Sequence, residues 1–75
     1  MQETIVERVA DGFPGASINV ELDGNRATIE VTSEAFVGMS RVKKQQAVYA
    51  CIQDFIADGT LHAVTIKAIE PDVRG

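Results

Sequence analysis

The sequence has few of the residues that commonly hold very small domains together. Its 75 residues include one cysteine, Cys51, and one histidine, His62. An internal disulfide needs two cysteines, and a closed zinc site needs four ligands, so the chain alone can form neither. A domain of this length buries a modest core, and packing, alone or with a partner, must therefore supply its stability. A lone cysteine is typical of a reducing compartment, so we expect a cytoplasmic protein.

Long apolar segments are also missing. No run approaches the roughly 20 residues that a membrane-spanning helix requires. The first residues, MQETIVERVADG, have no basic region followed by an apolar one, so the sequence predicts no secretory signal. No repeat, linker or low-complexity segment divides the chain, and we expect one domain over residues 1–75.

Positive charge is scarce and is gathered in one place. Seven basic residues oppose eleven acidic ones, for a net charge of −4, and Arg41, Lys43 and Lys44 lie within an acid-free stretch. The four other basic residues face all eleven acidic ones, a net of −7. This field disfavours non-specific binding to nucleic acid without excluding a local basic contact. The three basic residues are either a contact for an anion or acidic partner, or a solvated helix start.

Hydrophobic periodicity predicts a helix and a hairpin in the first half of the chain. Residues 2–11 have apolar residues at helical spacing, and Gly12 is suited to end this helix with a positive φ. Residues 17–22 and 26–32 alternate apolar and polar side chains, as half-buried strands do. Asp23-Gly24-Asn25 between them predicts a hairpin turn.

The second half predicts a longer helix and a third strand. Ser40 is suited to cap a helix that runs from about 41 to 57. Its apolar stripe consists of four residues: Val48, Ile52, Phe55 and Ile56. Residues 61–69 alternate as a strand, and parity places His62 at the rim of the core, on the same side as Val64.

The order α-β-β-α-β predicts the architecture. A helical crossover after the hairpin returns the chain so that the third strand lies parallel to one of the first two, in the right-handed sense. Each hairpin strand has one polar face, so helices cover one side of the sheet only. The predicted fold class is α+β, with two layers and a three-stranded mixed sheet.

The sequence has few residues that could take part in catalysis or bind a metal. His62 could ligate a metal, but a lone histidine is more often structural. Cys51 lies at the edge of the apolar stripe and is expected to behave as a small hydrophobe. Ser40, Cys51 and His62 show no recognisable triad spacing, and no phosphate-binding loop is present. We expect no enzymatic activity and no catalytic residue.

Two segments carry a specific resemblance to a known family. FVGMSRVKKQQAVY at residues 36–49, followed by LHAVTIKA at 61–68, resembles the BolA family, and in particular its short branch associated with acid stress. The match is strong over residues 36–68 and holds in pattern only over the N-terminal half. The resemblance implies a fold like that of class II KH domains, which agrees with the order of elements predicted above.

The resemblance also implies a partner and a cofactor. BolA-like proteins form heterodimers with monothiol glutaredoxins, with or without a shared [2Fe-2S] cluster that glutathione also ligates. His62 matches the family's histidine ligand, and a second ligand would come from the loop between the first two strands. The isolated chain, a monomer or weak homodimer, would hold no cluster. Ser40, Arg41, Lys43 and Lys44 are the expected contacts for a partner or for nucleic acid.

Members of the family have also been treated as transcriptional regulators. In that alternative the helix at 40–57 contacts DNA and the protein acts in a stress response. A third possibility is an adaptor without a cofactor.

The sequence departs from the family pattern in three places. Arg26 stands where related short members can carry a histidine after the hairpin turn, so the loop offers no second imidazole or thiolate. Gly38 stands alone, without the Gly-x-x-Gly loop by which KH domains hold nucleic acid. The chain also stops soon after Pro71, where many relatives continue into a further helix.

Overall fold

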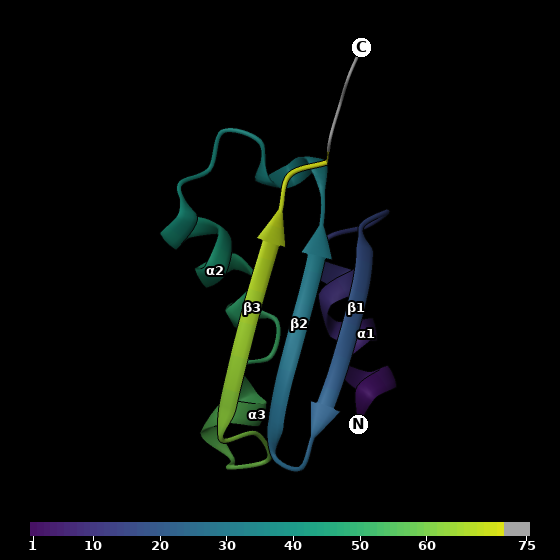
Figure 1. The fold of residues 1–75 in the computed structure, drawn as a ribbon, viewed down its shortest axis with the longest axis vertical. Coiled ribbons are helices and arrows are strands. Elements are labelled where there is room, and N and C mark those ends of the chain that lie inside the picture. The colour runs from purple at the N-terminus through teal and green to yellow at the C-terminus, as the bar shows by residue number, and fades with distance from the viewer. Residues whose placement is uncertain (72–75) are drawn as a thin grey trace.

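The computed structural model describes residues 1–71, and the residues after Pro71 lie outside this described part. The elements, in chain order, are α1 (Gln2–Gly12), β1 (Ser17–Asp23), β2 (Arg26–Thr32), a short 3₁₀ helix η1 (Glu34–Phe36), α2 (Arg41–Ala50), α3 (Gln53–Ala57) and β3 (Ala63–Ile69). Figure 1 shows the three strands side by side with the helices behind them. None of the helices in this part of the chain is long and apolar enough to cross a membrane.

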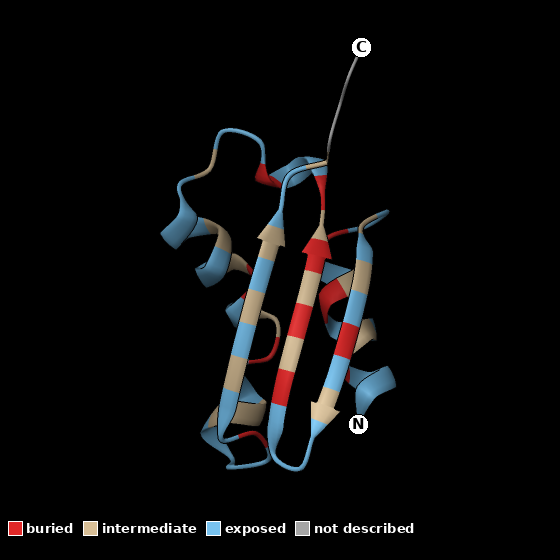
Figure 2. Cartoon of the chain, in the orientation of Figure 1, coloured by how far each residue is buried: buried red, intermediate tan, exposed pale blue. Residues whose placement is uncertain are grey.

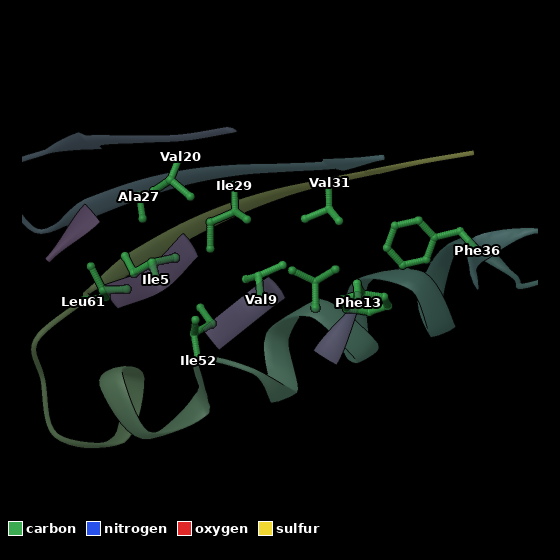
Figure 3. Packing of buried hydrophobic residues seen from close by; sticks show 11 residues of the cluster. Ile5, Val9, Phe13, Val20, Ala27, Ile29, Val31, Phe36, Ile52 and Leu61 are labelled. Carbon is green, nitrogen blue, oxygen red and sulfur yellow. The ribbon is translucent and has the colours of Figure 1, made fainter. Parts of the chain in front are cut away.

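The sheet has the predicted mixed topology. β2 is central, pairing with β1 antiparallel and with β3 parallel. Gly24 occupies the hairpin turn with φ 61°, a conformation that costs glycine little. All helices lie on one face of the sheet, as the close view of the core shows (Figure 3). The two-layer α+β prediction is therefore confirmed.

The strand register separates an apolar face from a polar one. On β2, Ala27, Ile29 and Val31 face the helices and are buried (Figure 2). They align across the sheet with apolar residues of both neighbours, and each row joins β1, β2 and β3: Leu22–Ala27–Val64, Val20–Ile29–Ile66 and Ile18–Val31–Ala68. The opposite face carries mostly polar side chains and is left without a helix, as the alternation predicts.

Helix α1 and two of the three phenylalanines, Phe13 and Phe36, complete the core beneath β1 and β2. Ile5 and Val9 of α1 are fully buried. The rings of Phe13 and Phe36 lie 5.0 Å apart at a tilt of 51°, a favourable arrangement for aromatic pairs. Phe13 therefore folds back onto the core, and Phe36 anchors the connection before α2.

The prediction of one helix over residues 41–57 is wrong. The chain forms two helices, because the N–H groups of Cys51 and Ile52 bond to carbonyls three residues back, at Val48 and Tyr49, both at 3.0 Å. These tighter bonds end α2, and Ile52, with φ −126°, begins a new turn. The change of direction buries Ile52 completely, whereas Phe55 stays half-buried.

Gly12 ends α1 as predicted but for a different reason. Its φ is not positive; the positive φ in this region belongs to Gly15 (82°). A Cβ on Gly12 would lie 2.8 Å from the sulfur of Cys51, closer than a real contact allows. The missing side chain at Gly12 therefore permits α1 to approach the break between α2 and α3.

The third strand starts two residues later than predicted, at Ala63. Leu61 is 2% exposed and its N–H bonds to the carbonyl of Phe55 at 3.0 Å, so it closes the core below α3. Strand parity would turn Leu61 outward, and the chain instead bends at His62 before the alternation begins. His62 is exposed and precedes the first residue of the strand, so the alternation that predicted it on the side of Val64 does not extend to it.

Candidate functional site

His62 is held beside the hairpin by its main chain. Its N–H donates a hydrogen bond to the carbonyl of Asn25 at 2.9 Å. The next residue, Ala63, pairs with Arg26 at the start of the parallel ladder. The imidazole therefore belongs to an exposed end of the sheet where the β1–β2 turn and the start of β3 meet (Figure 1).

The neighbouring polar groups at this end are carboxylates, which are hard oxygen ligands, and a guanidinium, which cannot ligate a metal. A shallow groove of about 450 Å³ on the polar face includes Glu21, Asp23 and Arg26. Within residues 1–71, no group of three or more His, Cys, Asp or Glu side chains could hold a metal ion. Iron–sulfur clusters are held by thiolates and, at some irons, imidazoles. In the described chain His62 is thus the one donor of this kind at the hairpin end, and it fits one cluster position only.

Cys51 has a structural setting. Its thiol donates to the carbonyl of Ala47 at 3.6 Å and lies against Gly12 of α1. Burial raises the pKa of the Cys51 thiol, which disfavours the reactive thiolate. The expectation that Cys51 behaves as a small hydrophobe agrees with this setting.

The basic residues start α2 at the other end of β3. Ser40 caps the helix as predicted, because its Oγ accepts a hydrogen bond from the N–H of Lys43 at 3.2 Å. Lys44 is only 18% exposed and pairs with Glu70 at 3.0 Å. Arg41 and Lys44 both line a groove with the end of β3, and Lys43 does not, as their helical spacing predicts.

The structure does not bring the basic residues and His62 together. His62 precedes the first residue of β3, whereas Lys44 contacts Glu70, which follows its last residue. The 7 residues of β3 separate them by roughly 20 Å at about 3.3 Å per residue. His62 and the basic residues of α2 therefore lie at opposite ends of β3 and are not adjacent. Ser40, Cys51 and His62 likewise lie on three separate parts of the fold.

A groove between α2 and β3 was missed by sequence reasoning. It has a volume of about 660 Å³, and residues of α2 and α3 line it together with one edge of the strand: Gln45, Gln46, Tyr49, Ala50, Gln53, Val64, Thr65 and Ile66. The glutamines at 45, 46 and 53 are the signal that could have revealed it. A helix that carries them beside a strand cannot seal that strand from water.

Two solved structures with this fold are a BolA protein and a BolA domain. The chain superimposes on the BolA domain of SufE1 from Arabidopsis thaliana with a TM-score of 0.84 and 27% identity, covering 93% of this chain and 91% of that one. It also matches BolA1 from Arabidopsis thaliana with a TM-score of 0.82 and 21% identity, over 99% and 95% of the two chains. The arrangement of helices and strands is thus that of BolA proteins.

The sequence comparisons agree with the fold. The family model for BolA-like proteins matches residues 19–72. The acid stress protein IbaG of Escherichia coli K12 is 48% identical over 54 residues, which are 72% of this chain and 64% of that protein. An uncharacterised protein from Acinetobacter guillouiae is 36% identical over 67 residues, 89% of this chain and 81% of the relative. The chain belongs to the BolA family.

Proposed function

We propose that this protein docks on a monothiol glutaredoxin and supplies His62 as a ligand to a shared [2Fe-2S] cluster, in iron–sulfur and stress-linked regulation. The observation that carries the proposal is the position of His62. It is exposed, and the bond from its N–H to the Asn25 carbonyl fixes its backbone beside the hairpin. A ligand that must reach a cluster held between two proteins needs this combination of access and a fixed backbone. The acid stress relative supports a role in stress.

The residues present at the hairpin end specify which cluster ligands this chain would supply. The family pattern asks for a second ligand from the loop between β1 and β2, and Arg26 stands there instead of a histidine. The glutaredoxin cysteine and glutathione supply the thiolates. This chain then contributes one imidazole, and we expect the cluster to be more labile than one with both family ligands.

The test is a titration of a [2Fe-2S]-loaded monothiol glutaredoxin, with glutathione, by this protein. Visible absorption and circular dichroism should change until the two proteins reach equal concentration. His62→Ala should remove most of the change, because it removes the proposed ligand. Asn25→Ala is the matched control, since it lies at the same end but keeps the main-chain carbonyl that bonds His62. Its spectrum should match that of the unsubstituted protein.

Docking and ligation are separated by a second measurement with the cluster-free glutaredoxin. Co-elution that survives His62→Ala would show that docking does not need His62, so the lost spectral change would then report ligation. If the unsubstituted protein neither co-elutes nor alters the spectrum, the proposal fails.

A substitution that adds a ligand tests the position of the second cluster ligand, where Arg26 stands. Arg26→His restores an imidazole beside the hairpin turn, and Arg26 pairs with Ala63, next to His62 in the chain. We expect this variant to slow loss of the cluster to a chelator, with Arg26→Gln as a control for the removed charge. Equal rates for both variants would show that residue 26 does not face the cluster.

A further inference from the structure

The outer edge of β3 has no neighbouring strand in the described chain. The sheet order is β1-β2-β3, so β3 pairs with β2 on one side only. Figure 1 shows α2 beyond β3 on the side away from β2, so the helix lies behind the place that a fourth strand would occupy. An open edge of this kind is a template for pairing with another extended chain.

The main chain of β3 identifies which groups face this edge. The carbonyl of Ile69 accepts a bond from the N–H of Ser33, so Ile69 directs its main-chain groups toward the chain of β2. Along a strand these groups alternate between the two neighbours. Val64, Ile66 and Ala68 therefore direct their N–H and C=O groups to the open edge. An added strand could form a ladder with these three residues.

The grooves beside this edge form one channel. The groove of about 660 Å³ between α2 and β3 continues into one of about 450 Å³, and the two share Gln45 and Ile66. The first has apolar and amide side chains. The second has Arg41, Lys44 and Lys67 at the end of β3. The channel is thus uncharged along most of its length and positive at one end.

We propose that this channel binds an extended peptide segment of a partner protein, which adds to β3 as a fourth strand. Alternate apolar side chains of the segment would lie against Tyr49 and Ala50 of α2, and an acidic group would lie near Arg41 and Lys67. Addition of a strand to an open edge beside a helix is a recurring mode of peptide recognition. This surface is distinct from the His62 end and does not depend on cluster binding.

The lining favours a peptide over a single nucleic-acid strand. A nucleic acid would bring a phosphate at every nucleotide, and among residues 1–71 no cationic side chain lines the groove of about 660 Å³. Lys44 in the other groove is already paired with Glu70 at 3.0 Å. One acidic group at one end matches the charge of the channel better than a continuous row of phosphates does.

The opposite edge of the sheet is less open. There the carbonyl of Val20 in β1 already accepts a hydrogen bond from the side chain of Gln2. α1 packs against β1, and Ile5 and Val9 are buried between them. The contrast points to β3 as the edge that receives the segment.

The test uses two synthetic peptides, each with the 7-residue length of β3 and alternating valine and threonine. One has two added glutamates at its N-terminus and the other at its C-terminus, so the preferred peptide reports the strand direction. Nuclear magnetic resonance should show saturable shifts of the amides of Val64, Ile66 and Ala68, with slower hydrogen exchange. The same peptide with N-methyl groups on alternate amides should not bind, because it keeps the side chains and loses the ladder.

Variants separate the channel from the rest of the surface. Ala50→Arg places a long cation in the groove and should abolish binding, whereas Ala57→Arg, outside the lining, should not change it. Arg41→Glu should weaken binding about fivefold. Lys43→Glu makes the same charge change in the same turn outside the channel, and should alter the affinity by less than about twofold. Folding of each variant is checked from its amide spectrum.

Three results would overturn the proposal. Binding by the N-methylated peptide would exclude strand addition. Equal effects of Arg41→Glu and Lys43→Glu would show a response to net charge only. A poly-dT oligonucleotide that shifts the same amides at lower concentration than either peptide, with strong salt dependence, would assign the channel to single-stranded nucleic acid instead.

Discussion

The two edges of the sheet are covered unequally. Beneath β1, α1 contributes two residues with 0% exposure, Ile5 and Val9, and Val20 of the strand is 1% exposed. Beneath β3, α2 contributes one buried residue, Val48, and every inner-facing residue of β3 stays half-buried. Figure 2 shows the difference as buried segments on β2 and β1 and none on β3.

This difference separates the part of the molecule that stabilises the fold from the part that is left for contact. A chain of 75 residues has little apolar surface to bury, so leaving one strand partly open has a cost in stability. The inner side of β3 nevertheless carries apolar Val64 and Ile66. Apolar surface that residues 1–71 leave partly uncovered is typical of a binding groove.

The largest expected effect comes from one substitution made on both sides of the β2–β3 ladder. Ile29 and Ile66 are direct partners in the register, but Ile29 is 0% exposed and Ile66 is half-buried. Ile29→Ala should lower the free energy of unfolding by about 3–4 kcal/mol, since it leaves a closed cavity. Ile66→Ala should lower it by about 1–2 kcal/mol, because water already reaches the site. Urea unfolding followed by circular dichroism measures both.

If Ile29→Ala does not fold, two smaller substitutions at the same positions allow the same comparison. Ile29→Val should cost about 1 kcal/mol and Ile66→Val about half of that. Equal losses at the two positions would mean that the β3 edge is covered in solution. Sedimentation would then show whether a second copy of the chain covers it.

A second prediction concerns the contact that closes the α1 side. Gly12→Ala should destabilise the protein by about 1–2 kcal/mol, because the new methyl group would meet the sulfur of Cys51, 2.8 Å away. Without that contact, alanine near a helix end would be neutral or favourable. Cys51→Ala in the same chain should therefore remove most of the loss. A double-mutant cycle by thermal unfolding measures the coupling, and additive effects would contradict it.

The fold could be predicted because local patterns agree with the tertiary structure. Alternation gives the two hairpin strands, and the crossover rule gives the parallel pairing of β3. The errors arise where long-range packing decides. The break after Ala50 exists because Ile52 must reach the core. The chain bends at His62 because the side chain of Leu61 closes the core. Periodicity along the chain carries neither constraint.

The site could be predicted in its residues but not in its geometry. The sequence identified His62 and the basic residues of α2 as notable, but it did not predict where they lie relative to each other. The parallel crossover places the start of α2 beside the end of β3, where Lys44 meets Glu70. The sequence did not reveal the channel, because the channel depends on which residues of β3 direct their main-chain groups away from β2. Only the pairing of the strands in the folded sheet decides this.

The smallest expected effects compare one ion pair from each side of the molecule. Arg8 of α1 pairs with Asp54 of α3 at 2.7 Å, with side chains 42% and 57% exposed. Lys44 of α2 pairs with Glu70 at 3.0 Å, and Lys44 is 18% exposed. Asp54→Asn and Glu70→Gln should each cost about 0.3–1 kcal/mol at low salt. At about 1 M salt, where screening acts within roughly 3 Å, the Asp54→Asn effect should vanish and part of the Glu70→Gln effect should remain. Thermal unfolding at the two salt concentrations measures both, and the same salt response for the two pairs would show that Lys44 is as accessible to water as Arg8.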